Sequence, residues 1–161
     1  MPRELQGGIV MKPKHRKLHI ALFAIYCALM LWLLFHRPGY MDGIPYWEQA
    51  KANLNLIPFR TLKLFSGLLH DHRPALVRAA IVNLAGNVNM FIPLGLFLPL
   101  IFGKLQKLWK TLLCVTLIIT AVELAQLFML VGSCDIDDLI LNLLGAGLGY
   151  ELYRLTQKPD C

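Results

Sequence analysis

Long apolar stretches separated by short polar segments make up most of this chain. Four of them approach the ~20 residues that a helix needs to cross the hydrocarbon core of a bilayer. The pattern predicts spans at about 18–36, 79–102, 111–131 and 136–155. It therefore indicates an all-α membrane protein with about four transmembrane helices in one domain, 18–155, between a basic tail at 1–17 and a short tail at 156–161.

The segment 37–78 is the one long connection in this pattern. It mixes Pro, Gly, aromatic and charged residues. A structureless connection of that length is uncommon in a compact protein unless it is functional or lies against another part of the molecule. Tyr46, Trp47 and Phe59 suit the headgroup level of a membrane, where aromatic side chains are enriched.

Basic residues beside the predicted spans orient the chain. Lys and Arg are enriched in cytoplasmic loops. The N-terminal tail, the short loop with Lys104, Lys107 and Lys110, and the tail beginning near Arg154 all fall on one side of a four-span arrangement. The turn at 132–135 has neither Lys nor Arg. We therefore expect both termini in the cytoplasm and the long connection outside, although that connection has basic residues of its own.

The composition agrees with a membrane protein and narrows its chemistry. Of the 161 residues, 57% are hydrophobic and 16% charged, and the mean hydropathy is +0.55. The net charge is +6, and the basic residues lie beside apolar runs. The sequence has no aromatic-rich RNA-binding strand and no zinc pattern, so we expect membrane lipids as partners and no nucleic acid. The four cysteines show no paired or CxxC spacing. We expect no disulfide framework, no metal and no cofactor.

Polar residues inside the predicted spans are the candidates for function. An ionisable side chain in a membrane helix costs roughly 2.5–3.5 kcal/mol on insertion scales and usually faces a cavity, a partner or a ligand. Spacings of three or four residues place these groups on common helical faces. We expect them to meet in one outward-facing polar pocket, with Gly145 and Gly149 allowing close helix packing beneath it. The candidate ligand-binding residues are Asn55, Phe59, Arg60, Asn83, Asn87, Glu123, Gln126, Asp135, Asp138 and Asn142.

Each candidate also has a structural explanation. Glu123 and Gln126 either bind a substrate or relay a proton, or they form an interhelical hydrogen bond that fixes packing. Asp135 and Asp138 either take up a cation or a proton, or they stabilise the N-terminus of the last helix. The asparagines either bind a polar headgroup or hydrogen-bond to neighbouring helices. Phe59 is either the lip of a ligand site or part of a turn back into the interface.

An ordered set of short motifs resembles the VanZ-like family. The motifs are Asn-Leu-x-Pro-Phe (55–59), Asn-x-x-x-Phe-x-Pro-x-Gly (87–95), Glu-x-x-Gln (123–126), Asp-Ile-x-Asp (135–138) and Asn-x-x-Gly-x-x-x-Gly (142–149). The resemblance covers roughly 53–155. It implies a small polytopic protein of the bacterial cell membrane, associated with low-level teicoplanin resistance in the glycopeptide-resistance clusters of Gram-positive bacteria. It assigns no catalytic residue, and it puts a role for Asp137 in doubt because some relatives have another residue there.

Two functions fit these observations. The first is a non-enzymatic membrane protein whose outer-leaflet pocket binds an amphiphile, such as a lipid-linked cell-wall precursor or the acyl tail of a lipoglycopeptide. The alternative is a membrane-embedded enzyme that acts on a lipid or a polyprenyl-phosphate with Glu123 and Asp138 as acid and base or as cation ligands. We favour the first, because no Ser, Cys or Thr lies in a recognisable nucleophile motif. A transporter of this size would need to form an oligomer, and the oligomeric state stays open.

Overall fold

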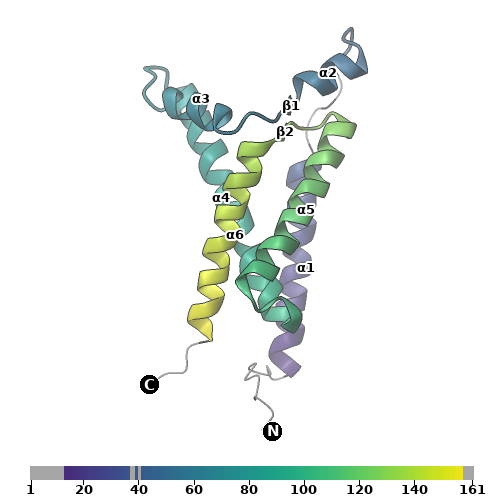
Figure 1. The fold of residues 1–161 in the computed structure, drawn as a ribbon, viewed down its shortest axis with the longest axis vertical. Helices are drawn as coiled ribbons and strands as arrows, with labels where there is room; N and C mark the ends of the chain where they lie inside the picture. The colour runs from purple at the N-terminus through teal and green to yellow at the C-terminus, as the bar shows by residue number, and fades with distance from the viewer. Residues whose placement is uncertain (1–12, 37–38, 40, 158–161) are drawn as a thin grey trace.

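Four long helices dominate the computed structural model, which describes residues 13–36, 39 and 41–157. The long helices are α1 (Pro13–Phe35), α4 (Pro74–Ile101), α5 (Leu108–Met129) and α6 (Ile136–Thr156). The short elements are α2 (Tyr46–Ala52), β1 (Leu54–Asn55), α3 (Arg60–Leu68), the 3-10 helix η1 (Gly103–Leu105) and β2 (Cys134–Asp135). Figure 1 shows the start of α1 and the end of α6 at one end of the bundle and α2, α3, β1 and β2 at the other, which we call the upper end.

The four predicted helices are present, with shifts of a few residues at their ends. α6 begins at Ile136 as predicted. α4 begins at Pro74, earlier than predicted. Proline is favourable in a first helical turn because its missing N–H would have no partner inside the helix. α4 then continues through Pro93 and Pro99 without a break.

Three of the helices are long and apolar enough to cross a membrane. They are Arg16–Phe35, Pro74–Ile101 and Leu108–Met129 within the described residues. α6 has a similar length but is less apolar, since it carries acidic residues in its first turn and both Glu151 and Arg154 near its end. The fold is therefore that of a helical membrane protein. That α6 also crosses the bilayer, and that both termini are cytoplasmic, stay predictions.

The connection between α1 and α4 contains structure that the sequence pattern did not predict. It holds two helices and a strand, and the longer of these helices, α3, has nine residues. β1 pairs in parallel with β2, with Leu54 opposite Cys134 and Asn55 opposite Asp135. The Tyr46 hydroxyl donates a hydrogen bond of 2.7 Å to the carbonyl oxygen of Phe128. The connection is thus fastened across the upper end of the bundle (Figure 1).

Glycines allow α4 and α6 to pack closely. A Cβ atom on Gly145 would lie 2.0 Å from the carbonyl oxygen of Val88, and one on Gly149 would lie 1.9 Å from that of Ile92. Gly95 of α4 makes a similarly close approach to α6. No side chain fits at these distances, so the close approach predicted at Gly145 and Gly149 is confirmed.

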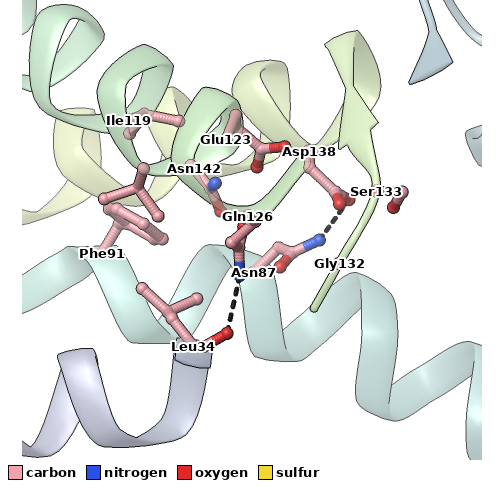
Figure 2. Close-up of a pocket in the computed structure, with 11 residues that line it drawn as sticks. Leu34, Asn87, Phe91, Ile119, Glu123, Gln126, Gly132, Ser133, Asp138 and Asn142 are labelled. Atoms are coloured by element: carbon pink, nitrogen blue, oxygen red, sulfur yellow. Dashed lines mark hydrogen bonds between the residues drawn. The ribbon is translucent and has the colours of Figure 1, made fainter. Parts of the chain in front are cut away.

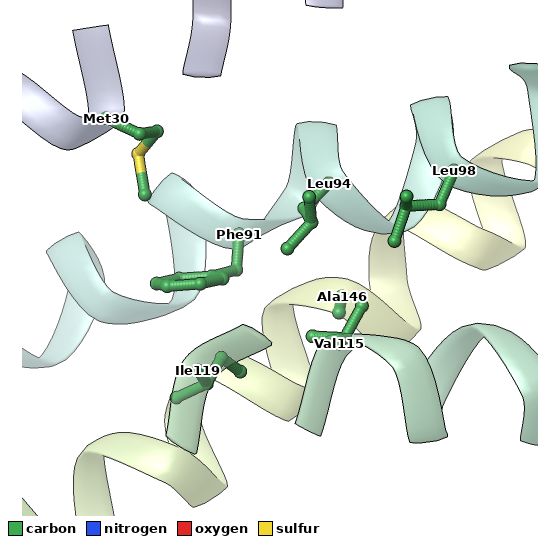
Figure 3. Close-up of a cluster of buried hydrophobic side chains, with 7 residues drawn as sticks. All are labelled: Met30, Phe91, Leu94, Leu98, Val115, Ile119 and Ala146. Atoms are coloured by element: carbon green, nitrogen blue, oxygen red, sulfur yellow. The ribbon is translucent and has the colours of Figure 1, made fainter. Parts of the chain in front are cut away.

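The apolar core joins all four long helices. Figure 3 shows its buried side chains, Met30, Phe91, Leu94, Leu98, Val115, Ile119 and Ala146. Among residues 16–36, Met30 is the one buried side chain. α1 is also held by the Tyr26 hydroxyl, which donates a 2.8 Å hydrogen bond to the carbonyl oxygen of Met90 on α4. Most of α1 is therefore free to face lipid.

Candidate functional site

A small polar cavity lies at the upper end of the bundle, where α1, α4, α5 and α6 meet. Its volume is about 40 Å³, enough for a few water molecules or one small polar group. Figure 2 shows how the side chains around it converge from the four helices. Its polar lining residues are Asn87, Glu123, Gln126, Ser133, Asp138 and Asn142. The predicted convergence of the polar residues of separate helices in one cavity is therefore observed for five of the candidates.

α5 contributes Glu123 and Gln126, both buried, at 8% and 5% exposure. The Gln126 side-chain amide donates a hydrogen bond of 2.8 Å to the carbonyl oxygen of Leu34. That carbonyl belongs to the last turn of α1, whose carbonyl groups lack partners inside the helix. Glu123 Oε2 accepts a hydrogen bond of 3.3 Å from the backbone N–H of Asp135. Both side chains thus have the packing role considered above in addition to lining the cavity.

α4 and α6 contribute the remaining amides and the second carboxylate. The Asn87 amide donates a hydrogen bond of 2.5 Å to Asp138 Oδ1, which links the two helices across the cavity wall. Asn142 lies one helical turn beyond Asp138 and is 3% exposed. Its Oδ1 is buried and has no hydrogen-bond partner among the described residues. A buried acceptor without a donor costs about 1–3 kcal/mol, so this oxygen marks a place where the cavity favours a donor group.

The ionisable residues of the cavity lining are acidic. Glu123 and Asp138 are the ionisable residues of the lining, and none of the lining residues is Lys, Arg or His. Among the described residues, no group of three or more His, Cys, Asp or Glu side chains is placed to hold a metal ion. The arrangement is rich in acceptor atoms and suits a ligand that donates hydrogen bonds or carries positive charge.

Asp135 lies above the cavity and caps α6. Its Oδ1 accepts a hydrogen bond of 2.9 Å from the N–H of Asp137, which confirms the capping explanation given above. Its other oxygen accepts hydrogen bonds from the Thr61 hydroxyl at 2.5 Å and the Asn55 amide at 3.1 Å. Asp135 and Asn55 therefore fasten the connection to α6 and do not line the cavity.

Asp137 fastens the start of α3. It is 0% exposed, and its carboxylate accepts hydrogen bonds from the backbone N–H groups of Phe59, Thr61 and Leu62 at 2.5, 2.8 and 3.0 Å. An acidic side chain stabilises a helix N-terminus, and here it belongs to another helix. The resemblance put a role for Asp137 in doubt, and the structure gives it one, which is to hold the start of α3.

Three other candidates lie outside the cavity lining. Phe59 is 63% exposed and precedes α3 with a left-handed backbone, φ 64°, which agrees with the turn explanation. Arg60 begins α3 and is exposed. Asn83 lies one turn above Asn87 on α4, and its Oδ1 is buried without a partner among the described residues.

Most of the chain is similar to a known protein family. A family model described as VanZ/LLP1 matches residues 23–157. The chain belongs to the VanZ/LLP1 family. It is 29% identical over 137 residues to "Protein VanZ" of Enterococcus faecium, which covers 85% of this chain and 74% of that protein. No solved structure matches at a significant level.

Among the cysteines that the structure describes in this VanZ/LLP1 chain, Cys134 shares a groove with two of the candidate residues. It lies with Glu123 and Asp135 along a largely apolar groove of about 150 Å³ between α5 and the start of α6. Burial, followed by the nearby carboxylates of Glu123 and Asp135, raises the pKa of the Cys134 thiol above its usual range. Since the thiolate is the nucleophile, this thiol is poorly suited to covalent chemistry at neutral pH.

Proposed function

We propose that this chain lowers susceptibility to teicoplanin-type lipoglycopeptides by binding a lipid-linked or amphiphilic ligand in its polar cavity, which faces outward. The observation that carries the proposal is the convergence of Asn87, Glu123, Asp138 and Asn142 in one buried cavity. Polar and ionisable groups inside a membrane protein usually serve a site or a pathway. Membership of the VanZ/LLP1 family supports the link to this resistance.

The direction of the cavity follows from the predicted topology. The start of α1, the turn between α4 and α5 and the end of α6 carry basic residues and lie away from the upper end (Figure 1). By the positive-inside rule we therefore expect the cavity on the outer side. There it is accessible to lipid-linked cell-wall precursors and to antibiotics that act outside the membrane.

The test is a comparison of two antibiotics in a susceptible Gram-positive host. Teicoplanin carries an acyl chain and vancomycin does not, so binding of an amphiphile predicts selective protection against teicoplanin. Glu123→Gln and Asp138→Asn, which keep side-chain size, are expected to lose this protection. Glu151→Gln is the matched control, because Glu151 is exposed and pairs with Arg154 far from the cavity.

Equal amounts of each variant in the membrane must be verified by immunoblot. Protection that survives both cavity substitutions, or that extends equally to vancomycin, contradicts the proposal.

A second candidate is an enzyme acting on a lipid or polyprenyl-phosphate. The presence of two carboxylates, Glu123 and Asp138, in the same cavity is the observation that favours it, because paired carboxylates can act as acid and base. It predicts a change in the membrane lipid profile that depends on divalent ions and disappears in Glu123→Gln, measured by lipidomics.

A further inference from the structure

An apolar groove lies beside the polar cavity, between α1, α4 and α5. It has a volume of about 190 Å³. An apolar cavity of ~150 Å³ can hold a benzene ring, so the groove has room for a segment of an alkyl chain. Its lining from α1 runs from Leu34 to Tyr26, a length of ~12 Å at 1.5 Å per residue. The groove therefore follows α1 from the cavity toward the middle of the bundle.

The groove and the cavity are neighbours. Leu34, Phe91 and Val122 line both of them. The lining of the groove contains no charged side chain, whereas the cavity holds Glu123 and Asp138. A polar end and an apolar end thus meet at one wall, which is the arrangement that an amphiphile requires.

The polar end selects the head of that amphiphile. Asn142 Oδ1 is buried without a partner among the described residues and lines the cavity, so it needs a donor. The lining holds the carboxyl groups of Glu123 and Asp138 and no basic residue, so no lining residue would neutralise an anionic head. Phosphate, which offers mainly acceptors and negative charge, is the least suitable head for this cavity.

We infer that the cavity and the groove together bind a single-chain amphiphile whose head is a hydroxyl or amine donor and not a phosphate. The head donates hydrogen bonds to Asn142 and the carboxylates, and the chain lies in the groove along α1. This inference rests on the proposed function, because it names the ligand class of the same cavity. Of the ligands considered there, it excludes those that would place a phosphate in the cavity.

The test uses the full chain in phosphatidylcholine nanodiscs and a monoacylglycerol with a photoreactive group in the middle of its acyl chain. We expect crosslinks to the part of α1 that carries Cys27 and Leu31, both of which line the groove. Monomyristoylglycerol and myristylamine should compete for this crosslink at least several-fold better than myristyl phosphate, which has the same chain length.

A matched pair of variants separates the groove from ordinary contact with lipid. Leu31 and Leu29 lie on α1 with similar exposure, 54% and 53%, but only Leu31 lines the groove. Leu31→Trp should fill the groove and reduce crosslinking several-fold, whereas Leu29→Trp should leave it unchanged. Val122 lies at the wall that the groove shares with the cavity. Val122→Phe should also reduce crosslinking several-fold, which is a second test of the groove.

Equal effects of Leu31→Trp and Leu29→Trp, or competition by the phosphate as strong as by the other two probes, overturn the inference. The antibiotic comparison is independent of this assay. Teicoplanin protection that depends on Glu123, together with such a failure, leaves the proposed function standing and removes only this ligand class. If teicoplanin protection also fails to depend on Glu123, both the proposed function and this ligand class are contradicted.

Discussion

The carboxylate of Asp137 holds together two segments that are far apart in the sequence. Its three backbone donors begin α3, and Thr61 lies 76 residues before it in the chain. Hydrogen bonds to a charged group contribute about 1.5–3 kcal/mol each, and donors left buried without a partner cost more than exposed ones. At the scale of single residues, Asp137 therefore anchors the connection through three backbone hydrogen bonds.

Replacing Asp137 by Ala should release the start of α3. We expect destabilisation of at least about 2 kcal/mol and faster hydrogen exchange at the amides of Thr61 and Leu62, measured by mass spectrometry in nanodiscs. Asp42→Ala, in the exposed part of the connection, is the control. Unchanged exchange at the two amides contradicts the anchoring role.

The raised pKa of the Cys134 thiol gives a pH-dependent prediction. A higher pKa means less thiolate at any given pH, so alkylation by iodoacetamide should be slow near neutral pH and should rise only at more alkaline pH than for an ordinary thiol. Glu123→Gln should move the profile partway toward lower pH, because it removes one negative charge but leaves the burial that is the main cause.

The rates are measured by mass spectrometry in a chain whose other cysteines are replaced by Ser. A profile at the ordinary thiol position, or one that Glu123→Gln leaves unmoved, contradicts this description of the site.

Among single residues, the cavity was easier to predict than the anchors. Glu123, Gln126 and Asn142 stand out because polar groups are rare in apolar stretches. Asp137 did not stand out, since its partners are backbone N–H groups, which every sequence has and which carry no residue signature. Thr61 was missed for a related reason, because a lone Thr in a polar segment gives no signal before its partner Asp135 is placed.

At the scale of elements, the close contact between α4 and α6 depends on glycines, which have no side chain. The carbonyl oxygen of Val88 lies 2.0 Å from a Cβ built on Gly145, and a backbone atom cannot move aside as a flexible side chain can. The apolar stretches alone predicted the four long helices well, because each stretch approaches the length of a membrane span. α3 could not be predicted in this way, since it is short and its start depends on Asp137 of another helix.

A pair of glycine substitutions tests this packing. Gly145→Ala should force α4 and α6 apart and lower stability by about 1–3 kcal/mol. Gly147→Ala, on the same helix with nothing within 4 Å of the added Cβ, should be neutral or stabilising by up to ~1 kcal/mol, because Ala is the better helix former. Unfolding by titration with SDS compares them, and equal midpoints contradict the packing described here.

At the scale of the whole molecule, the orientation decides which compartment the cavity faces. Cysteines introduced at Gly67 and Gly103 test it, since both positions are open to added atoms and lie at opposite ends of the long helices. In a chain without its native cysteines, a membrane-impermeant maleimide should label Gly67→Cys on intact cells and Gly103→Cys only after permeabilisation. Thr156→Cys should behave like Gly103→Cys if α6 crosses the membrane, and labelling of Thr156→Cys on intact cells contradicts a fourth span.

The central claim is that the polar cavity binds a ligand and is not merely a packing device, and Asn142→Leu tests it most directly. If a ligand supplies the hydrogen-bond donor for Asn142 Oδ1, removing this buried acceptor should raise the stability of the unliganded protein by about 1–3 kcal/mol. The same change should abolish teicoplanin protection, because the ligand loses its acceptor. We therefore predict that Asn142→Leu raises stability, measured by SDS titration, and lowers teicoplanin protection. Leu144→Ala, on the exposed side of α6, is the control. Lower stability together with lost protection would show that Asn142 serves packing, and unchanged protection would show that the cavity does not bind the ligand through this residue.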